Sequence, residues 1–199
     1  MTSDELEDGA RMRYAVGFLT TLTILVMIVL ARPAEAIVYV STDFPTLVAD
    51  ARAIAVGRVV VLESRWTEGR RGIETLVTLE VEHYLKGNLG PSVTVRTPGG
   101  RMGPYLSVMP GAPRFAEGDR VVLFLAGDGP ALPHVLGLGQ GVFRIVIDSS
   151  GHPIVTPETL PAVVGAPVPV VRGDLLRRPT PLDRFATDVK MLAAQRGAR

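Results

Sequence analysis

The chain has 199 residues, with 21 Lys or Arg against 20 Asp or Glu and no Cys. This near-neutral charge does not fit a nucleic-acid-binding protein, because such proteins carry a strongly basic surface. The lack of Cys excludes disulfides, thiolate metal sites and Cys nucleophiles. Apolar burial alone must therefore hold the chain together.

Residues 1–36 have the features of a secretory signal peptide. Arg11 precedes an uncharged stretch over 15–30, which is shorter than the about 20 residues of a typical membrane span. The small-x-small pattern that ends at Ala36 predicts cleavage before Ile37. We therefore expect an exported protein, either periplasmic or secreted.

An uncleaved leader is the alternative interpretation, and it would anchor the chain in the membrane. Acidic residues dilute the positive charge of the first segment, and Arg32 follows the apolar stretch, where a stop-transfer charge would stand. Contact with a membrane is expected only in this case.

The first element expected after the leader is a short helix. Thr42 or Asp43 is a suitable N-cap, and Pro45 suits the first turn. The apolar residues that follow share one side of such a helix: Leu47, Val48 and Ala51.

A long antiparallel hairpin is predicted next. Its first strand runs from Ile54 to Trp66, with a bulge or bend at Gly57, and its second from Thr75 to Leu85. A polar turn over 68–72 joins them. Alternation along the second strand predicts one apolar face made of Val77, Leu79, Val81 and Leu85.

Further strands are predicted around Val93–Val95, at Arg120–Ala126 and at Val142–Asp148. The last of these should point three side chains inward: Phe143, Ile145 and Ile147. The connection Pro98–Pro113 is rich in Gly and Pro and unusually long, which is typical of a functional surface loop.

The C-terminal part divides into two predicted pieces. Pro153–Pro181 holds seven prolines in 29 residues, which argues against a central strand and predicts an extended segment. A helix follows from about Pro181 to Gln195, capped by Thr180. Its apolar stripe consists of Leu182, Phe185, Val189 and Leu192.

These elements predict a mainly β fold: a small closed or partly closed OB-like barrel of five or six antiparallel strands, with a short N-terminal and a C-terminal helix. A sandwich is the alternative, because strand spacing does not separate the two. The expected organisation is a signal peptide at 1–36, a barrel domain at 37–155, a proline-rich segment at 156–180, and the helix with its tail at 181–199.

Three patterns in this order resemble the netrin-like, tissue-inhibitor-of-metalloproteinase-like OB domain, and more closely exported bacterial proteins of that plan. They are Val56-Gly57-Arg58-Val59, the strand ending Leu85-Lys86-Gly87, and Phe115 through Gly118 to Leu125. The resemblance implies the barrel fold and an extracellular setting. The animal inhibitors chelate zinc through a Cys directly after the signal peptide, and here that position is Ile37.

No catalytic or metal-binding constellation is recognisable in the sequence. The histidines, His83, His134 and His152, lie too far apart for a metal-ligand motif, and no Gly-x-Ser-x-Gly pattern accompanies them. We therefore expect no metal, no cofactor and no enzymatic activity. A hydrolase with an unrecognised site is the alternative.

The candidate binding residues lie near the tip of the predicted hairpin and in the long loop: Trp66, Arg70, Arg71 and Tyr105. Aromatic residues and arginines are enriched at binding hot spots. The sequence thus predicts an exported binding module with an extracytoplasmic protein partner. Alternatively, Trp66 simply covers one end of the barrel.

Overall fold

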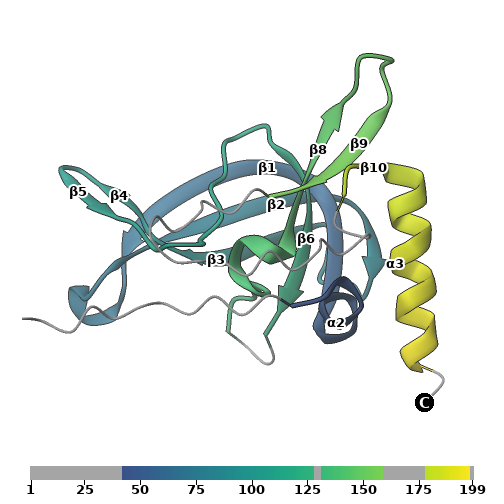
Figure 1. The fold of residues 1–199 in the computed structure, drawn as a ribbon. Helices are drawn as coiled ribbons and strands as arrows, with labels where there is room; N and C mark the ends of the chain where they lie inside the picture. Colours follow the sequence, from purple (N-terminus) through teal and green to yellow (C-terminus); the bar gives the residue numbers. More distant parts are fainter. Residues whose placement is uncertain (1–41, 128–130, 159–177, 198–199) are drawn as a thin grey trace, which may run out of the picture. The chain divides into compact units, whose positions relative to one another are not determined.

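The computed structural model describes residues 42–127, 131–158 and 178–197. The predicted signal peptide and its cleavage site, and most of the proline-rich segment, lie outside these ranges. The described part is mainly β, with an eight-stranded sheet, a separate two-stranded sheet and two α-helices (Figure 1). None of its helices has the length and apolar character needed to span a membrane.

Eight strands make up the large sheet: β1 (Ala53–Trp66), β2 (Ile73–Lys86), β3 (Ser92–Pro98), β6 (Arg120–Ala126), β7 (His134–Val135), β8 (Val142–Ile147), β9 (Pro153–Pro157) and β10 (Thr180–Pro181). The small sheet is a hairpin of β4 (Gly100–Met102) and β5 (Tyr105–Ser107). The remaining elements are the helices α2 (Phe44–Asp50) and α3 (Leu182–Gly197) and the 3-10 turns η1 (Glu68–Arg70) and η2 (Leu138–Gly141).

Five strands form a ring in the order β1-β2-β3-β7-β6, which closes because β6 also pairs with β1. The mainly β class and the partly closed barrel with its two helices are thus confirmed. One detail differs from the expected antiparallel arrangement. Strand β7 pairs in parallel with β3, through Arg96 and His134, because a ring of five strands cannot alternate direction at every pair, and the other four pairs are antiparallel.

The β1–β2 hairpin extends beyond this ring. Strand β6 pairs only with the first half of β1, from Ala53 to Arg58. The second half continues beside β2 as far as Trp66 and Ile73, and β3 accompanies β2 to Pro98. The turn at η1 therefore stands away from the ring closure, next to β4 and β5 (Figure 1).

The first half of β1 separates two apolar cores. Ala53, Ala55 and Val59 face the interior of the ring, where they pack with residues such as Leu79 and Leu123. The alternate residues Ile54 and Val56 face outward into a second core beneath the helices. Burial on both faces explains the unbroken apolar run at the start of this strand.

A β-bulge in β2 changes which face its residues occupy. Val56 lies opposite His83, but the next residue, Gly57, lies opposite Val81, so Glu82 is an extra residue in β2. Leu85 therefore joins the core beneath the helices, whereas Tyr84 packs against the core inside the ring. The prediction that Leu85 shares a face with Val77 was wrong for this reason.

Gly57 stands on β1 opposite this bulge, at the irregularity expected from the sequence. The pairing of β1 with β2 shifts between Val56 and Gly57. A Cβ atom at Gly57 would lie 2.3 Å from the backbone oxygen of Glu80, so only glycine permits the two strands to approach this closely.

Both helices cover the outer core. Helix α2 is capped by Asp43, whose carboxylate accepts a 2.7 Å hydrogen bond from the Thr46 amide. Its Phe44 ring makes edge-on contacts with Phe143 and Phe185. Phe185 and Val189 of α3 are buried in the same core, which confirms the predicted apolar stripe.

Three expectations near the C-terminal part need correction. Ile147 is 63% exposed instead of inward, because β8 and β9 continue past the ring as a hairpin (Figure 1). Strand β9 lies within the proline-rich stretch, and its prolines stand at its ends. Thr180 pairs with Val155 as part of β10, and its hydroxyl donates to the carbonyl of Arg178 instead of capping α3.

Candidate functional site

The end of the β1–β2 hairpin carries an aromatic pair. The rings of Trp66, at the end of β1, and Tyr105, at the start of β5, meet edge to face with centroids 5.4 Å apart. Trp66 is half-buried and Tyr105 is 60% exposed. The contact therefore joins the hairpin to the long loop and leaves much of the tyrosine ring open to solvent.

Arg70 completes this cluster. Its guanidinium carbon lies 5.9 Å from the centre of the Trp66 ring, within the range of a cation–π contact. Its backbone φ is +54°, a left-handed conformation that disfavours residues with a Cβ atom. The turn thus holds an exposed cation over an aromatic face at a position where glycine would be less strained.

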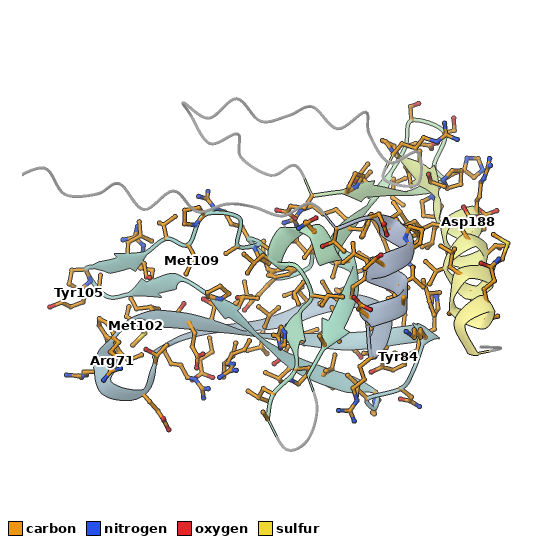
Figure 2. The ribbon with its side chains drawn as sticks, turned by 60° about the horizontal axis from the view of Figure 1, so that its bottom comes forward. Arg71, Tyr84, Met102, Tyr105, Met109 and Asp188 are labelled. Carbon is orange, nitrogen blue, oxygen red and sulfur yellow. The ribbon has the colours of Figure 1, made fainter. Side chains whose placement is uncertain are left out.

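Arg71, the fourth predicted residue, lies at the same end of the molecule (Figure 2). It does not join the aromatic contact but lines a neighbouring hollow of about 460 Å³, together with Arg96 and Met109. The structure therefore brings Trp66, Arg70 and Tyr105 together and places Arg71 beside them.

The long loop is more ordered than the sequence indicates, because the β4–β5 hairpin lies within it. Beyond Tyr105 it exposes further apolar side chains. Leu106 is 59% exposed and Val108 62% exposed, and Met109 is exposed as well. We call these four residues, Tyr105, Leu106, Val108 and Met109, the apolar strip. Contiguous apolar surface of this kind is typical of an interaction site.

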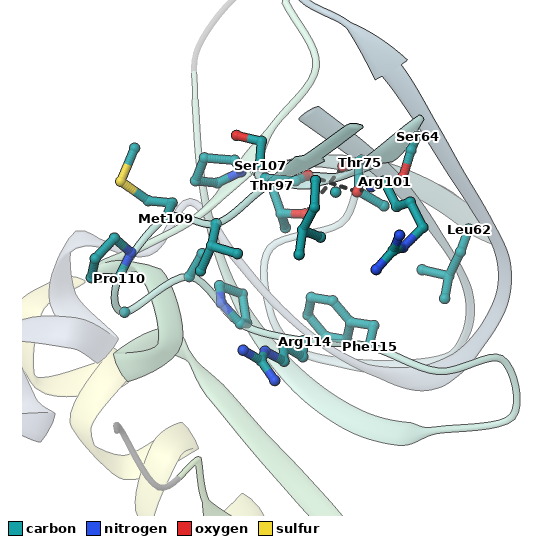
Figure 3. A pocket seen from close by; sticks show the side chains of 18 of the residues that line it. Leu62, Ser64, Thr75, Thr97, Arg101, Ser107, Met109, Pro110, Arg114 and Phe115 are labelled. Atoms are coloured by element: carbon teal, nitrogen blue, oxygen red, sulfur yellow. Dashed lines mark hydrogen bonds between the residues drawn. The ribbon is translucent and has the colours of Figure 1, made fainter. Parts of the chain in front are cut away.

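A groove of about 780 Å³ runs between this loop and strands β1, β2 and β3 (Figure 3). Leu62 and Phe115 contribute apolar surface to it, and Arg101 and Arg114 contribute positive charge. The groove and the aromatic cluster share the same loop, so one extended partner would reach both.

The far end of the loop is fixed by Arg144 on β8. Its guanidinium donates to the backbone carbonyl of Arg114 and to Asp119 at 2.7 Å, and it pairs with Glu158 at 3.0 Å. Burial opposes the charge of Arg144, but hydrogen bonds to Glu158 and Asp119 outweigh burial and raise the pKa of the guanidinium. This network ties the loop to the body of the sheet.

The three histidines come from separate elements and do not assemble into a site. His83 lies on β2 opposite Val56, and His134 lies on β7. His152 stands 4.0 Å from Asp148 in the exposed turn after β8. Among the residues that the structure describes, no group of three His, Cys, Asp or Glu is placed to hold a metal ion.

Asp148 has a structural role in that turn. Its carboxylate accepts backbone hydrogen bonds from His152 and Ser150, each at 2.8 Å. The hydrogen bond from His152 is the main cause that lowers the pKa of this carboxyl. The carboxylate is thus engaged in shaping the turn.

Sequence reasoning singled out Tyr105 but missed its neighbours Leu106, Val108 and Met109. The available signal was the presence of large apolar residues in a loop otherwise rich in Gly and Pro. It also missed Arg101 and Arg114, because only the folded loop brings these two positions to one groove.

In comparisons with known proteins, no family model matches the chain, and no curated protein or solved structure matches it significantly.

Proposed function

We propose that this protein is a non-enzymatic binding module that acts outside the cytoplasm and binds another protein. The observation that carries the proposal is the cluster of Trp66, Arg70 and Tyr105. At this tip the Trp66 indole contacts both the Tyr105 phenol ring and the Arg70 guanidinium, and Trp, Tyr and Arg are the residue types enriched at binding hot spots.

The neighbouring apolar strip supports a protein partner. Large apolar side chains on a surface loop gain free energy when a partner covers them. The cations Arg70 and Arg71 beside the strip would orient a partner that carries negative charge. A surface with an apolar centre and a charged rim is typical of protein interfaces.

Capture by the immobilised full chain tests this proposal. Wild-type protein is incubated with an extracytoplasmic extract, and retained proteins are identified by mass spectrometry. The test variant combines Arg70→Ala, Arg71→Ala and Tyr105→Ala. All three side chains are exposed, so the fold should persist, and we expect the captured partner to be lost.

The matched control variant removes two cations and one large apolar residue from α3: Arg184→Ala, Lys190→Ala and Met191→Ala. These side chains are exposed as well. Capture should survive in the control. Equal loss in both variants, or equal retention, would contradict a partner surface at the hairpin tip.

Export is the second part of the proposal, and it is supported by the leader sequence. The mature protein should begin at Ile37. Intact-mass measurement on protein from the extracytoplasmic fraction tests this directly. A mass that retains residues 1–36 would favour the membrane-anchored alternative.

A further inference from the structure

The groove beneath the long loop has a floor whose hydroxyl groups already form hydrogen bonds within the protein. The Thr75 hydroxyl donates to the Gly99 carbonyl at 2.8 Å and lies 3.1 Å from the Ser64 hydroxyl. The Thr97 hydroxyl donates to the Thr75 carbonyl at 3.1 Å. The floor therefore presents little polar chemistry to a ligand, and apolar contact dominates there.

Two arginines supply the charge that remains. Arg101 and Arg114 are exposed and line the groove, and in Figure 3 the ring of Phe115 lies between their guanidinium groups. Within the described part of the chain, neither side chain has an ion-pair partner. By contrast, Arg65 of the same hairpin is paired with Glu74 at 2.8 Å.

The acidic residue that lines the groove does not neutralise these arginines. Glu158 pairs with Arg144 at 3.0 Å, and Asp119, close by, pairs with the same guanidinium at 2.7 Å. Among the described residues, the groove thus has two positive charges without ion-pair partners, with apolar surface between them. A complementary occupant carries apolar groups flanked by carboxylates.

We propose that the groove binds an extended acidic segment of the partner protein. In this complex Arg101 and Arg114 each pair with the carboxylate of an Asp or Glu. The apolar residues between the two acids lie against Phe115, Leu62 and Leu106. This inference rests on the proposed function, because it assumes a protein partner and names the segment that is recognised.

Selection from a phage-displayed library of random decapeptides on the immobilised full chain tests the inference. Enriched peptides should carry apolar residues between two Asp or Glu residues. One enriched peptide is then synthesised with a fluorescent label, and its Kd is measured by anisotropy. Changing both acids to amides should weaken binding at least about tenfold, and rising salt should weaken it as well.

The test variant is Arg101→Gln with Arg114→Gln, and the matched control is Arg184→Gln with Lys190→Gln on α3. We expect the Kd to rise at least about tenfold in the first and to change less than about twofold in the second. The amide peptide should bind the test variant and the control variant with the same Kd. The ion pair is already lost when the peptide carries amides, so removing the arginines has no further effect.

Four results would overturn the inference. They are no enrichment over an empty support, enriched peptides without an acidic preference, binding that survives in the Arg101→Gln, Arg114→Gln variant, and a wild-type dimer that this variant dissociates. The last result would make a second copy of the chain the occupant. Light scattering of both proteins detects it.

Failure of this inference can be distinguished from failure of the proposed function. Extract capture that depends on Arg70, Arg71 and Tyr105 but not on the groove arginines leaves the hairpin tip as the binding surface and refutes the groove. Suppose instead that peptide binding depends on Arg101 and Arg114, and that the tip variant captures its partner as well as wild type does. This result would keep the groove as a binding surface and refute the hairpin tip.

Discussion

The guanidinium of Arg144 lies 2.7 Å from the carboxylate of Asp119, and this contact joins strand β8 to the turn before β6. The same guanidinium holds the backbone of Arg114, where the long loop ends. Arg144 therefore fixes the C-terminal end of the long loop. The apolar strip lies earlier in the same loop.

Replacing Arg144 with Met should lower the free energy of unfolding by about 1–3 kcal/mol, because Asp119 and Glu158 then keep their charges without a partner. Arg120→Met is the control, since it leaves one carboxylate, Glu82, without its partner instead of two, and it should cost at most about 1 kcal/mol. Urea denaturation measures both. Equal costs would show that the Arg144 network adds nothing beyond a surface ion pair.

Gly57→Ala should destabilise the protein by about 1–3 kcal/mol, because the new Cβ would meet the Glu80 oxygen. Gly72→Ala is the matched control: its nearest atom would be the Thr67 hydroxyl oxygen at 3.8 Å, which is an ordinary contact. Thermal unfolding should shift little in the control. A Gly57→Ala protein with unchanged stability would mean that β1 and β2 separate here without cost.

Phe143→Ala should cost about 3–5 kcal/mol, because this ring is 1% exposed among other aromatic rings and its removal leaves a cavity. Tyr105→Ala should cost no more than about 1.5 kcal/mol, the value of an aromatic pair. Denaturant titration compares the two. Similar losses would contradict the assignment of Phe143 to the core and Tyr105 to the surface.

Arg70→Gly should leave stability unchanged or raise it slightly, since glycine adopts the left-handed backbone at this position without strain. The same variant should weaken partner capture, because it removes the cation over Trp66. Arg71→Gly is the comparison: its φ is −80°, so glycine there should cost about 0.5–1 kcal/mol. A clear loss of stability in Arg70→Gly would show that this arginine is structural.

The Glu82–Arg120 pair should make stability depend on pH. The hydrogen bond from Arg120 lowers the pKa of Glu82 below its ordinary value of 4.5. The folded state therefore binds this proton less readily than the unfolded state. The contribution is present above pH 4.5 and is lost as the pH falls through the lower pKa of the folded protein.

Comparing wild type with Glu82→Gln at about pH 7 and about pH 2.5 measures this contribution. The difference in unfolding free energy should be below about 1 kcal/mol near neutrality and vanish in acid. A difference that persists in acid would assign the effect of the substitution to packing.

Local pattern predicted the elements whose signal is carried by a few adjacent residues. The cap at Asp43, the glycine at 57 and the stripe with Phe185 all depend on short-range sequence, and the structure bears them out. The face of Leu85 was not predictable in this way. It depends on an extra residue in the pairing of two strands, which alternation within one strand does not reveal.

The candidate site, too, was predictable from the sequence only in part. Residue type was enough to select Trp66 and Tyr105, but only the β4–β5 hairpin brings their rings into contact. The two groove arginines, Arg101 and Arg114, lie 13 positions apart in the sequence, without charge alternation or a motif between them. Their proximity to one groove is a property of the folded loop, which composition does not encode.

The order of the large sheet also bears on where a strand of another chain could be added. Pairing with β6 covers the first half of β1, and the strand at the other end of the sheet order is β10, which has two residues, one of them Pro181. Proline lacks the amide hydrogen that an added strand would need, and so short an edge is a poor template. Addition of a strand from another copy of the chain is therefore disfavoured at this edge of the sheet.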